Sequence, residues 1–312
     1  MLSRAGLYNK LFVVSETLRA LSATDSRRKI LFSRKPDWES AIASGFRSTR
    51  HEVTFAELSR ENVLKHDLVV PLTLEALMSL DGMRALLEDN PIAIPSLQSV
   101  ALCNDKDLFN RALIDVGYGK LIPSIDGNLG YPYILKKKVD EWSANSFIVR
   151  DRRDEETFAA KIADPDYFRQ TFVPGRSEYA AHLVFQGGRV MCSLNVRYLF
   201  ACDTPIKGRD KLVSSEVCGC PYLDQFAAIL KFIGFEGLCC FNYKAVDGAP
   251  YVLELNPRFG GSLAPFFFAF IRHLSRRKLS KAINAGASSP HTQPQLGSVY
   301  VEPPEITKQR IG

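Results

Sequence analysis

The chain has 312 residues, of which 46% are hydrophobic and 24% are charged. This length allows two or three compact units, and the composition is that of a folded globular protein rather than a disordered or fibrous one. The net charge of +6 is modest, and the basic residues form no stripe interleaved with aromatic side chains. A nucleic-acid binder is therefore disfavoured.

The cysteines and the apolar runs indicate a cytoplasmic protein without a membrane span. The seven cysteines lack the spacing of a zinc site, and their use suits a reducing compartment. The first ten residues contain no signal-peptide core. The most apolar run, residues 266–271, is too short to span a bilayer and is predicted to be a core helix.

The first hundred residues alternate predicted strands with predicted helices. Strands are expected at 29–33, 66–72 and 90–95, and helices at 55–65 and 74–88. The continuous apolar character of the second strand indicates burial on both faces, as in a parallel sheet. The alternation predicts a small open α/β domain at the front of the chain.

A helix is predicted within residues 99–119, with Asn104 or Asp105 as its N-cap. Lys106 then lies in its first turn. Taken alone, Lys106 fits an ordinary solvated side chain. Residues 131–139 form a predicted strand whose hairpin partner is 147–150.

The loop between these two strands, residues 140–146, contains no glycine, so its backbone has few options for positive φ. At the end of the first strand, Lys136 and Lys138 share one face while Lys137 points to the other.

The middle of the chain predicts further antiparallel strands. A helix at 154–163 precedes a strand that ends at Pro174-Gly175, and Gly187-Gly188 suits a tight turn between strands at 180–185 and 190–198. Arg197 on the second of these strands is a candidate ligand for a substrate carboxylate or a phosphoryl group, or else an exposed side chain. Residues 200–217, which include Lys207, are expected to be irregular and to border an acceptor site. A helix is expected at 221–233.

The closing hairpin, with strands at 238–245 and 250–256, places polar residues on one face. Odd positions are apolar or aromatic, whereas Asn242, Glu254 and Asn256 are even. Placing Asn242 opposite Glu254 requires a three-residue loop at 247–249, because a two-residue turn would put Asn242 opposite Leu253. We therefore predict the three-residue loop.

The string Glu254-x-Asn256-Pro257-Arg258 combines oxygen ligands suited to Mg²⁺ with a guanidinium suited to phosphate. It resembles the metal-binding signature of the ATP-grasp superfamily, carboxylate–amine ligase type. The resemblance covers about residues 99–270. It implies an α+β fold in which two subdomains hold ATP between antiparallel sheets, preceded by the small α/β domain.

The resemblance also implies a role for particular residues. Mg²⁺, or Mn²⁺, would lie on Asn242, Glu254 and Asn256, and Lys136 and Arg258 would be catalytic. ATP would contact Lys106, Lys136, Gln170, Thr171, Phe172, Val173 and Glu178. This chain departs from the family in the glycine-free loop, in having Thr171 where the family often has an acid, and in having Asn242 where it usually has Asp, Glu or Gln. We expect Asn242 to weaken metal binding before ATP arrives.

The implied activity is ligation of a small carboxylic acid to an amine through an acylphosphate, with release of ADP and phosphate. Phosphorylation or carboxylation on the same scaffold, and nucleotide binding without turnover, remain alternatives. The expected partners are small molecules, not nucleic acid or membrane, and a homodimer is left open.

The expected organisation divides the chain into five parts. Residues 1–100 form the front domain, 101–125 the linker helix and 126–185 the subdomain with the phosphate loop and adenine hinge. Residues 186–287 form the subdomain with the metal site, and 288–312 a polar tail.

Overall fold

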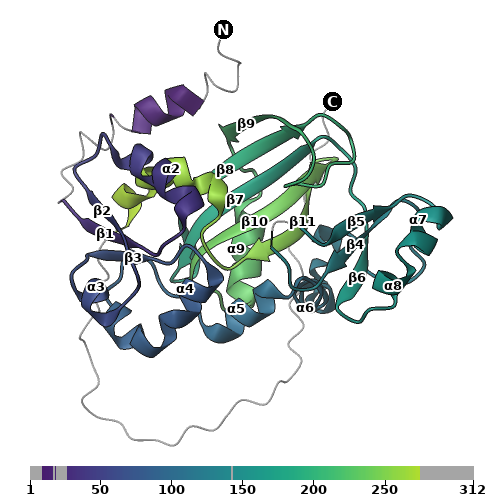
Figure 1. Cartoon of the computed structure of the whole chain (residues 1–312), viewed down its shortest axis with the longest axis horizontal. Coiled ribbons are helices and arrows are strands. Elements are labelled where there is room, and N and C mark those ends of the chain that lie inside the picture. Colours follow the sequence, from purple (N-terminus) through teal and green to yellow (C-terminus); the bar gives the residue numbers. More distant parts are fainter. Residues whose placement is uncertain (1–8, 17, 19–26, 142, 275–312) are drawn as a thin grey trace, which may run out of the picture. The chain divides into compact units, whose positions relative to one another are not determined.

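The computed structural model describes residues 9–16, 18, 27–141 and 143–274. These residues belong to one compact unit with three β-sheets (Figure 1). The predicted polar tail at 288–312 and most of the helix predicted after Phe270 lie outside the described residues.

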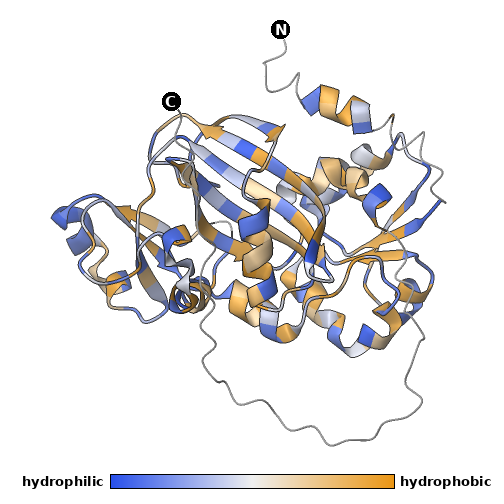
Figure 2. Ribbon diagram, turned by 180° about the vertical axis from the view of Figure 1, so that it is seen from behind, coloured by the Kyte–Doolittle hydropathy of each residue, from blue (hydrophilic) through white to orange (hydrophobic). Residues whose placement is uncertain are grey.

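The first sheet is parallel, as predicted, with strand order β2-β1-β3. Its strands are β1 (Lys29–Phe32), β2 (Glu52–Phe55) and β3 (Leu68–Val70), and they are largely apolar (Figure 2). The strand predicted at 90–95 is wrong. The side chain of Asn90 instead bonds the backbone N–H and carbonyl of Val69 at 2.8 and 3.1 Å, so a side chain completes the hydrogen bonding of this edge.

Short helices surround this sheet: α2 (Pro36–Phe46), α3 (Arg60–Leu64), α4 (Leu74–Ser79) and the 3₁₀ helix η1 (Asp81–Leu87). The predicted helix at 55–65 is only partly correct, because Phe55 ends β2. The helix predicted at 74–88 is divided at Leu80, just before Gly82, a residue that weakens an α-helix.

Asp105 separates α5 (Leu97–Asn104) from α6 (Lys106–Leu113) and caps the second helix, as predicted. Its extended backbone breaks the helical run, and its carboxylate accepts hydrogen bonds from the backbone N–H groups of Asp107 and Leu108. Lys106 is therefore fixed as the first residue of α6. Two short turns, η2 (Ile114–Tyr118) and η3 (Gly119–Leu121), follow.

The second sheet is antiparallel, with order β5-β4-β6. It comprises β4 (Tyr133–Lys137), β5 (Ser146–Val149) and β6 (Tyr167–Thr171), which confirms the predicted hairpin. The helix predicted at 154–163 is two helices, α7 (Arg152–Thr157) and α8 (Ala159–Ile162), which are separated by Phe158. Side chains of this sheet and of these helices share a small core around Tyr133 and Leu135.

The third sheet has five antiparallel strands in the order β11-β10-β7-β8-β9. They are β7 (Ser177–Gln186), β8 (Arg189–Phe200), β9 (Leu212–Cys218), β10 (Gly237–Val246) and β11 (Ala249–Asn256). Strand β9 lies in the region predicted to be irregular, so that prediction is wrong in part. Because β7 belongs to this sheet, the chain leaves the second sheet before residue 177 rather than at the predicted boundary of 185.

Each face of the third sheet has its own cover. Helix α9 (Leu223–Phe232) packs Phe226 against Phe241 and Tyr243 on one face. On the other face, Val184 and Val196 share a core with the front domain and with the 3₁₀ helix η4 (Gly261–His273). The apolar run at 266–271 is therefore a core element, as predicted. No helix among the described residues is long and apolar enough to cross a membrane.

The hairpin β10–β11 has a shorter loop than predicted, but Asn242 and Glu254 pair as predicted. Val246 pairs with Ala249, so the loop has two residues, Asp247 and Gly248, both with positive φ. The predicted three-residue loop is wrong. The register shifts after Asn242, where Tyr243 pairs with Val252 but Asn242 pairs with Glu254. The extra residue of this bulge restores the polar face.

Replacing Gly45 with alanine should destabilise the protein because α2 packs directly on η4. A Cβ at Gly45 would lie 2.7 Å from the backbone oxygen of Pro265. We expect a loss of about 1–3 kcal/mol in the free energy of unfolding, which exceeds the helix-propensity gain of about 1 kcal/mol. Urea denaturation measures this loss. Gly82→Ala is the matched control, since a Cβ there meets nothing within 4 Å. Equal midpoints for the two variants would contradict the packing argument.

Candidate functional site

Most of the predicted site residues line one cavity between the second and third sheets. Nine residues do so: Lys106, Lys136, Gln170, Thr171, Phe172, Val173, Glu178, Asn242 and Glu254. Asn256 and Arg258 line an adjoining cavity, which also includes Asn242 and Glu254. Arg197 lines neither of the two. Its guanidinium pairs with Glu216 on β9, so we do not include it in the proposed substrate site.

Glu254 lies at the centre of a polar cluster. Its Oε1 accepts hydrogen bonds from the side-chain amides of Asn242 at 2.5 Å and Asn256 at 3.1 Å. The Nζ of Lys106 lies 3.6 Å from Oε2. Burial alone would raise the pKa of this carboxyl, but Lys106 and the two amides outweigh burial and lower the pKa to about 2. Glu254 therefore remains a carboxylate at neutral pH.

Lys136 extends from β4 into the same cavity and is buried. Its Nζ donates a hydrogen bond of 2.7 Å to Oε1 of Gln170 on β6. Burial lowers the pKa of Lys136 to about 8, although the negative charge of Glu254 opposes that effect. Because burial disfavours the charged form of Lys136, a bound anion nearby would stabilise that charged form.

Two further lysines line the cavity, and the sequence pattern assigns neither of them a contact in the site. Lys244 on β10 donates hydrogen bonds to the carbonyl oxygens of Val173 and Gly175 at 2.9 and 2.8 Å, and so holds the strand connection after β6. Burial lowers its pKa. Strand alternation could have identified Lys244 as a site residue, since it occupies the polar face of the hairpin, two positions after Asn242.

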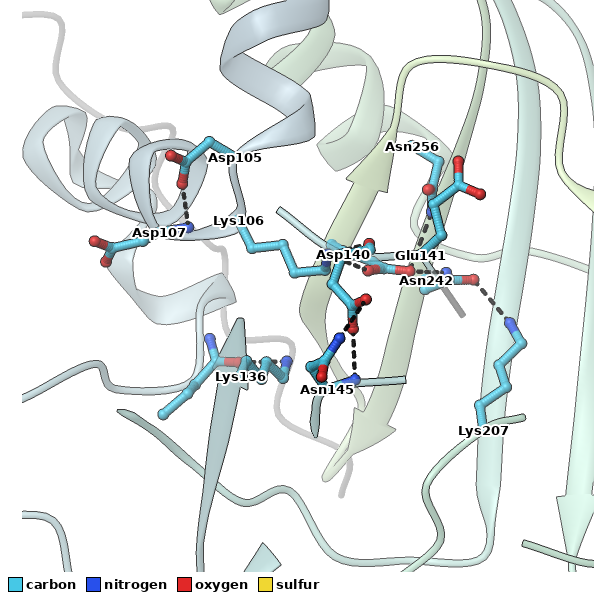
Figure 3. A network of polar contacts seen from close by, with 12 residues as sticks. Asp105, Lys106, Asp107, Lys136, Asp140, Glu141, Asn145, Lys207, Asn242 and Asn256 are labelled. Atoms are coloured by element: carbon cyan, nitrogen blue, oxygen red, sulfur yellow. Dashed lines mark hydrogen bonds and ion pairs between the residues drawn. The ribbon is translucent and has the colours of Figure 1, made fainter. Parts of the chain in front are cut away.

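Lys207 enters the cavity from the connection between β8 and β9. Its Nζ lies 3.0 Å from Oδ1 of Asn242 (Figure 3). The same atom lies 3.5 Å from Oε1 of Glu178 and 4.3 Å from the centroid of the Tyr198 ring. Burial opposes its charge, but Tyr198 and Glu178 outweigh burial and raise its pKa. The sequence placed this segment beside an acceptor site but gave no contact for Lys207.

The charges that line the cavity do not cancel. Four lysines (106, 136, 207 and 244) face two glutamates (178 and 254), which leaves an excess of two positive charges. Figure 3 shows three of the lysines directed toward the Asn242 cluster from different elements. Because like charges in a confined space are costly, this arrangement favours a ligand with several negative charges.

The described part of the loop at 140–146 is tied to the site from both sides. The Nζ of Lys106 bonds the carbonyl of Asp140 at 2.7 Å, and Arg258 pairs with Glu141 at 2.9 Å. In place of a glycine, Ser143 adopts positive φ. The cavity has about 60 Å³ of free space, whereas ligand pockets typically span about 300–1,000 Å³. Side chains must therefore move before a nucleotide can enter.

The adjoining cavity has a volume of about 470 Å³ and extends from Glu254 toward α2 and η4. His182 lies in its floor, fully buried, with Nε2 2.7 Å from the hydroxyl oxygen of Ser262. Burial and the nearby Lys207 lower the pKa of His182 to about 3, so it is neutral. A Cβ at Gly260 would lie 2.5 Å from the His182 ring, so only glycine allows this close approach.

The oxygen atoms around Glu254 suit a hard cation such as Mg²⁺, with one carboxylate and two amide groups. Among the described residues there is no group of three or more His, Cys, Asp or Glu that could hold a metal. The Oδ1 of Asn242 accepts its hydrogen bond from Lys207. The donor set therefore fits Mg²⁺, provided that Lys207 releases this oxygen.

Comparison with known proteins gives matches among solved structures only. No family model and no curated protein matches the sequence. Phosphoribosylamine–glycine ligase from Thermotoga maritima has a TM-score of 0.54 and 17% identity, covering 76% of this chain and 70% of that one. D-alanine–D-alanine ligase from Bacillus anthracis has a TM-score of 0.51 and 15% identity, covering 77% and 89%.

N5-carboxyaminoimidazole synthase from Aspergillus clavatus, solved with ADP and 5-aminoimidazole ribonucleotide, has a TM-score of 0.51 and 15% identity. It covers 76% of this chain and 71% of its own. These structures are ATP-grasp proteins, and the match with them extends over about three quarters of the chain. The chain has the ATP-grasp fold.

Proposed function

We propose that the protein is an ATP-dependent ligase that joins a carboxylic acid to an amine through an acylphosphate. The observation that supports this most is the excess of two positive charges around Glu254, at the position where the predicted triphosphate site and metal ligands coincide. The adjoining cavity of about 470 Å³ favours an enzyme over a binding module, because it offers room for a second molecule beside the phosphates.

In this proposal the nucleotide lies between the two antiparallel sheets. Backbone groups at 170–173 would read the adenine edge, and Lys244 keeps that backbone in place through its two hydrogen bonds. Glu178 would address the ribose end of the nucleotide. Lys106 and Lys136 would contact the phosphates.

Asn242, Glu254 and Asn256 would hold Mg²⁺ or Mn²⁺, which when bound neutralises phosphate charge. Lys136 and Arg258 would stabilise the charge of the transferred phosphoryl group. A carboxylate oxygen of the acid would attack the γ-phosphorus and release ADP. The amine would then attack the acyl carbon, release phosphate and lose a proton, which gives the amide. We also propose a cytoplasmic location, consistent with seven cysteines that form no disulfide.

The first prediction concerns turnover. Wild-type protein should release ADP over many turnovers only when a carboxylic acid and an amine are both present, with one amide formed per ADP. Coupled ADP detection and mass spectrometry of the product measure both quantities.

Glu254→Ala should lower this rate at least about 100-fold, a loss typical for removal of one electrostatic contact in an active site. ADP release with a phosphorylated acid as the final product would show a kinase instead. No release above the Glu254→Ala background with any acid–amine pair would contradict enzyme function.

The second prediction concerns pH. Above pH 8 the free protein loses the Lys136 proton, whereas a bound triphosphate favours the charged form. Binding of a non-hydrolysable ATP analogue should therefore take up a proton, and its affinity should fall between pH 8 and 9.5. Calorimetry in two buffers of different ionisation enthalpy measures the uptake. Lys136→Arg should abolish it because the guanidinium stays charged, and Lys137→Met should leave it unchanged. An affinity independent of pH in this window would contradict the role of Lys136.

The third prediction concerns the metal. Without nucleotide, wild-type protein should bind Mn²⁺ weakly, because its ligand set has one carboxylate. Asn242→Asp places a second carboxylate opposite Glu254 and should raise Mn²⁺ affinity about tenfold or more, as added ligand charge does. Electron paramagnetic resonance of free Mn²⁺ gives the affinity. Asn128→Asp, at an exposed position, controls for net charge. Tight binding by the wild-type protein alone would overturn this view of the site.

A further inference from the structure

The cavity beside Glu254 is lined by both polar and apolar side chains. Arg258, Asn256 and Ser262 come from the end of β11 and the start of η4. The Arg258 side chain is only 12% exposed, yet Glu141, its carboxylate partner among the described residues, is 53% exposed. A buried guanidinium with so accessible a partner can exchange it for a ligand carboxylate.

Another part of the lining of this cavity is aromatic and aliphatic. It is formed by Trp38 of α2, Tyr198 and Phe200 of β8, and Leu212 of β9. Trp38 and Phe200 are 7% and 2% exposed, so packing against the surrounding residues fixes their positions. The floor combines two small residues, Ala180 and Cys240, with the neutral ring of His182. Water molecules find few hydrogen-bond partners beside these apolar side chains, whereas an apolar group of similar shape is stabilised there.

The wall is also fixed in shape. A Cβ at Gly261 would lie 3.1 Å from the Trp38 ring, and Trp38 packs against Phe259 with ring centroids 5.7 Å apart. The glycine at 261 thus permits the start of η4 to contact the indole and to bring Ser262 into the cavity. An ordered aromatic wall binds a ring or branched chain without the cost of ordering it first.

We propose that this cavity binds the acid substrate, and that the acid carries an aromatic or branched aliphatic side chain. Its carboxylate lies at Arg258, next to Glu254, and its apolar part lies between Trp38, Tyr198 and Phe200. The assignment rests on the proposed ligase function, because that function requires a carboxylate beside the phosphates. It goes further in excluding small polar acids as the preferred substrates.

Binding measured without turnover tests the proposal. The chain has two tryptophans, so in a Trp142→Phe background the fluorescence of Trp38 reports directly on the cavity. Phenylpropanoate, isocaproate and propanoate are titrated in turn, with a non-hydrolysable ATP analogue present. We expect the first two acids to quench Trp38 and to bind about 10- to 100-fold more tightly than propanoate, as burial of one ring or branched chain predicts. Phenylpropanol, which lacks the carboxylate, should bind more weakly than phenylpropanoate.

A matched pair of variants locates the apolar part. Leu212 and Val213 are adjacent and exposed, at 44% and 53%, but only Leu212 lines the cavity. Leu212→Asp should weaken phenylpropanoate at least about tenfold and leave propanoate within about twofold, since the new charge faces the apolar part alone. Val213→Asp should change neither. Both positions are exposed, so loss of folding does not confound the comparison.

Several results would overturn the assignment. Equal affinity for phenylpropanoate and propanoate, or equal effects of Leu212→Asp and Val213→Asp, would exclude the apolar wall as a determinant. Competition between phenylpropanoate and the ATP analogue would place the acid in the nucleotide cavity. These outcomes are separate from failure of the ligase proposal, which is read from ADP and amide formation. Tight binding of the apolar acids without ADP release would leave the cavity assignment intact and remove the ligase.

Discussion

The site depends on an unbalanced set of charges held in a confined space. Four ammonium groups converge on two carboxylates, and the lowered pKa of Lys136 shows that burial already disfavours its charge. Removing a lysine would relieve this repulsion, yet the fold holds each one by a specific bond, such as Lys136 to Gln170. A polyanion supplies the missing negative charge. In the proposed function, affinity for a triphosphate would therefore arise from the relief of this repulsion between buried charges.

A bulge in the hairpin β10–β11 makes this charge cluster possible. The two-residue turn at Asp247 and Gly248 matches strand twist, but with regular pairing it would place Asn242 opposite an apolar side chain. The extra residue in β11, Leu253, shifts the register by one and returns the amide of Asn242 to Glu254. Pro257 then lies just beyond the end of the strand, and the glycines at 260 and 261 allow η4 to approach His182 and Trp38 closely.

The sequence predicts the parts of this site that follow from local rules. Strand periodicity places Glu254 and Asn256 on one face, and the capping preference of Asp105 fixes Lys106 at the start of a helix. The predicted three-residue loop is wrong, although the predicted pairing of Asn242 with Glu254 is correct. A bulge and a longer loop give the same alternation of polar and apolar positions along the strands, so the sequence pattern does not distinguish them. The sequence does not predict the contact of Lys207 with Asn242. The two residues are 35 positions apart and Lys207 lies in an irregular segment, so no helix or strand periodicity describes their contact.

Lys207 links the two cavities, because it lines both and holds the Asn242 oxygen that a metal would need. An ammonium 3.0 Å from that oxygen would repel a cation bound to it, so binding of a metal there would favour movement of Lys207. That movement changes a wall of the acid cavity as well. The aromatic side chains of Trp38, Tyr198 and Phe200 line the same cavity, where a bound apolar group would displace water. An acylphosphate formed there would be protected by the apolar group that also selects the acid, so selectivity for the acid and protection from hydrolysis have one physical origin.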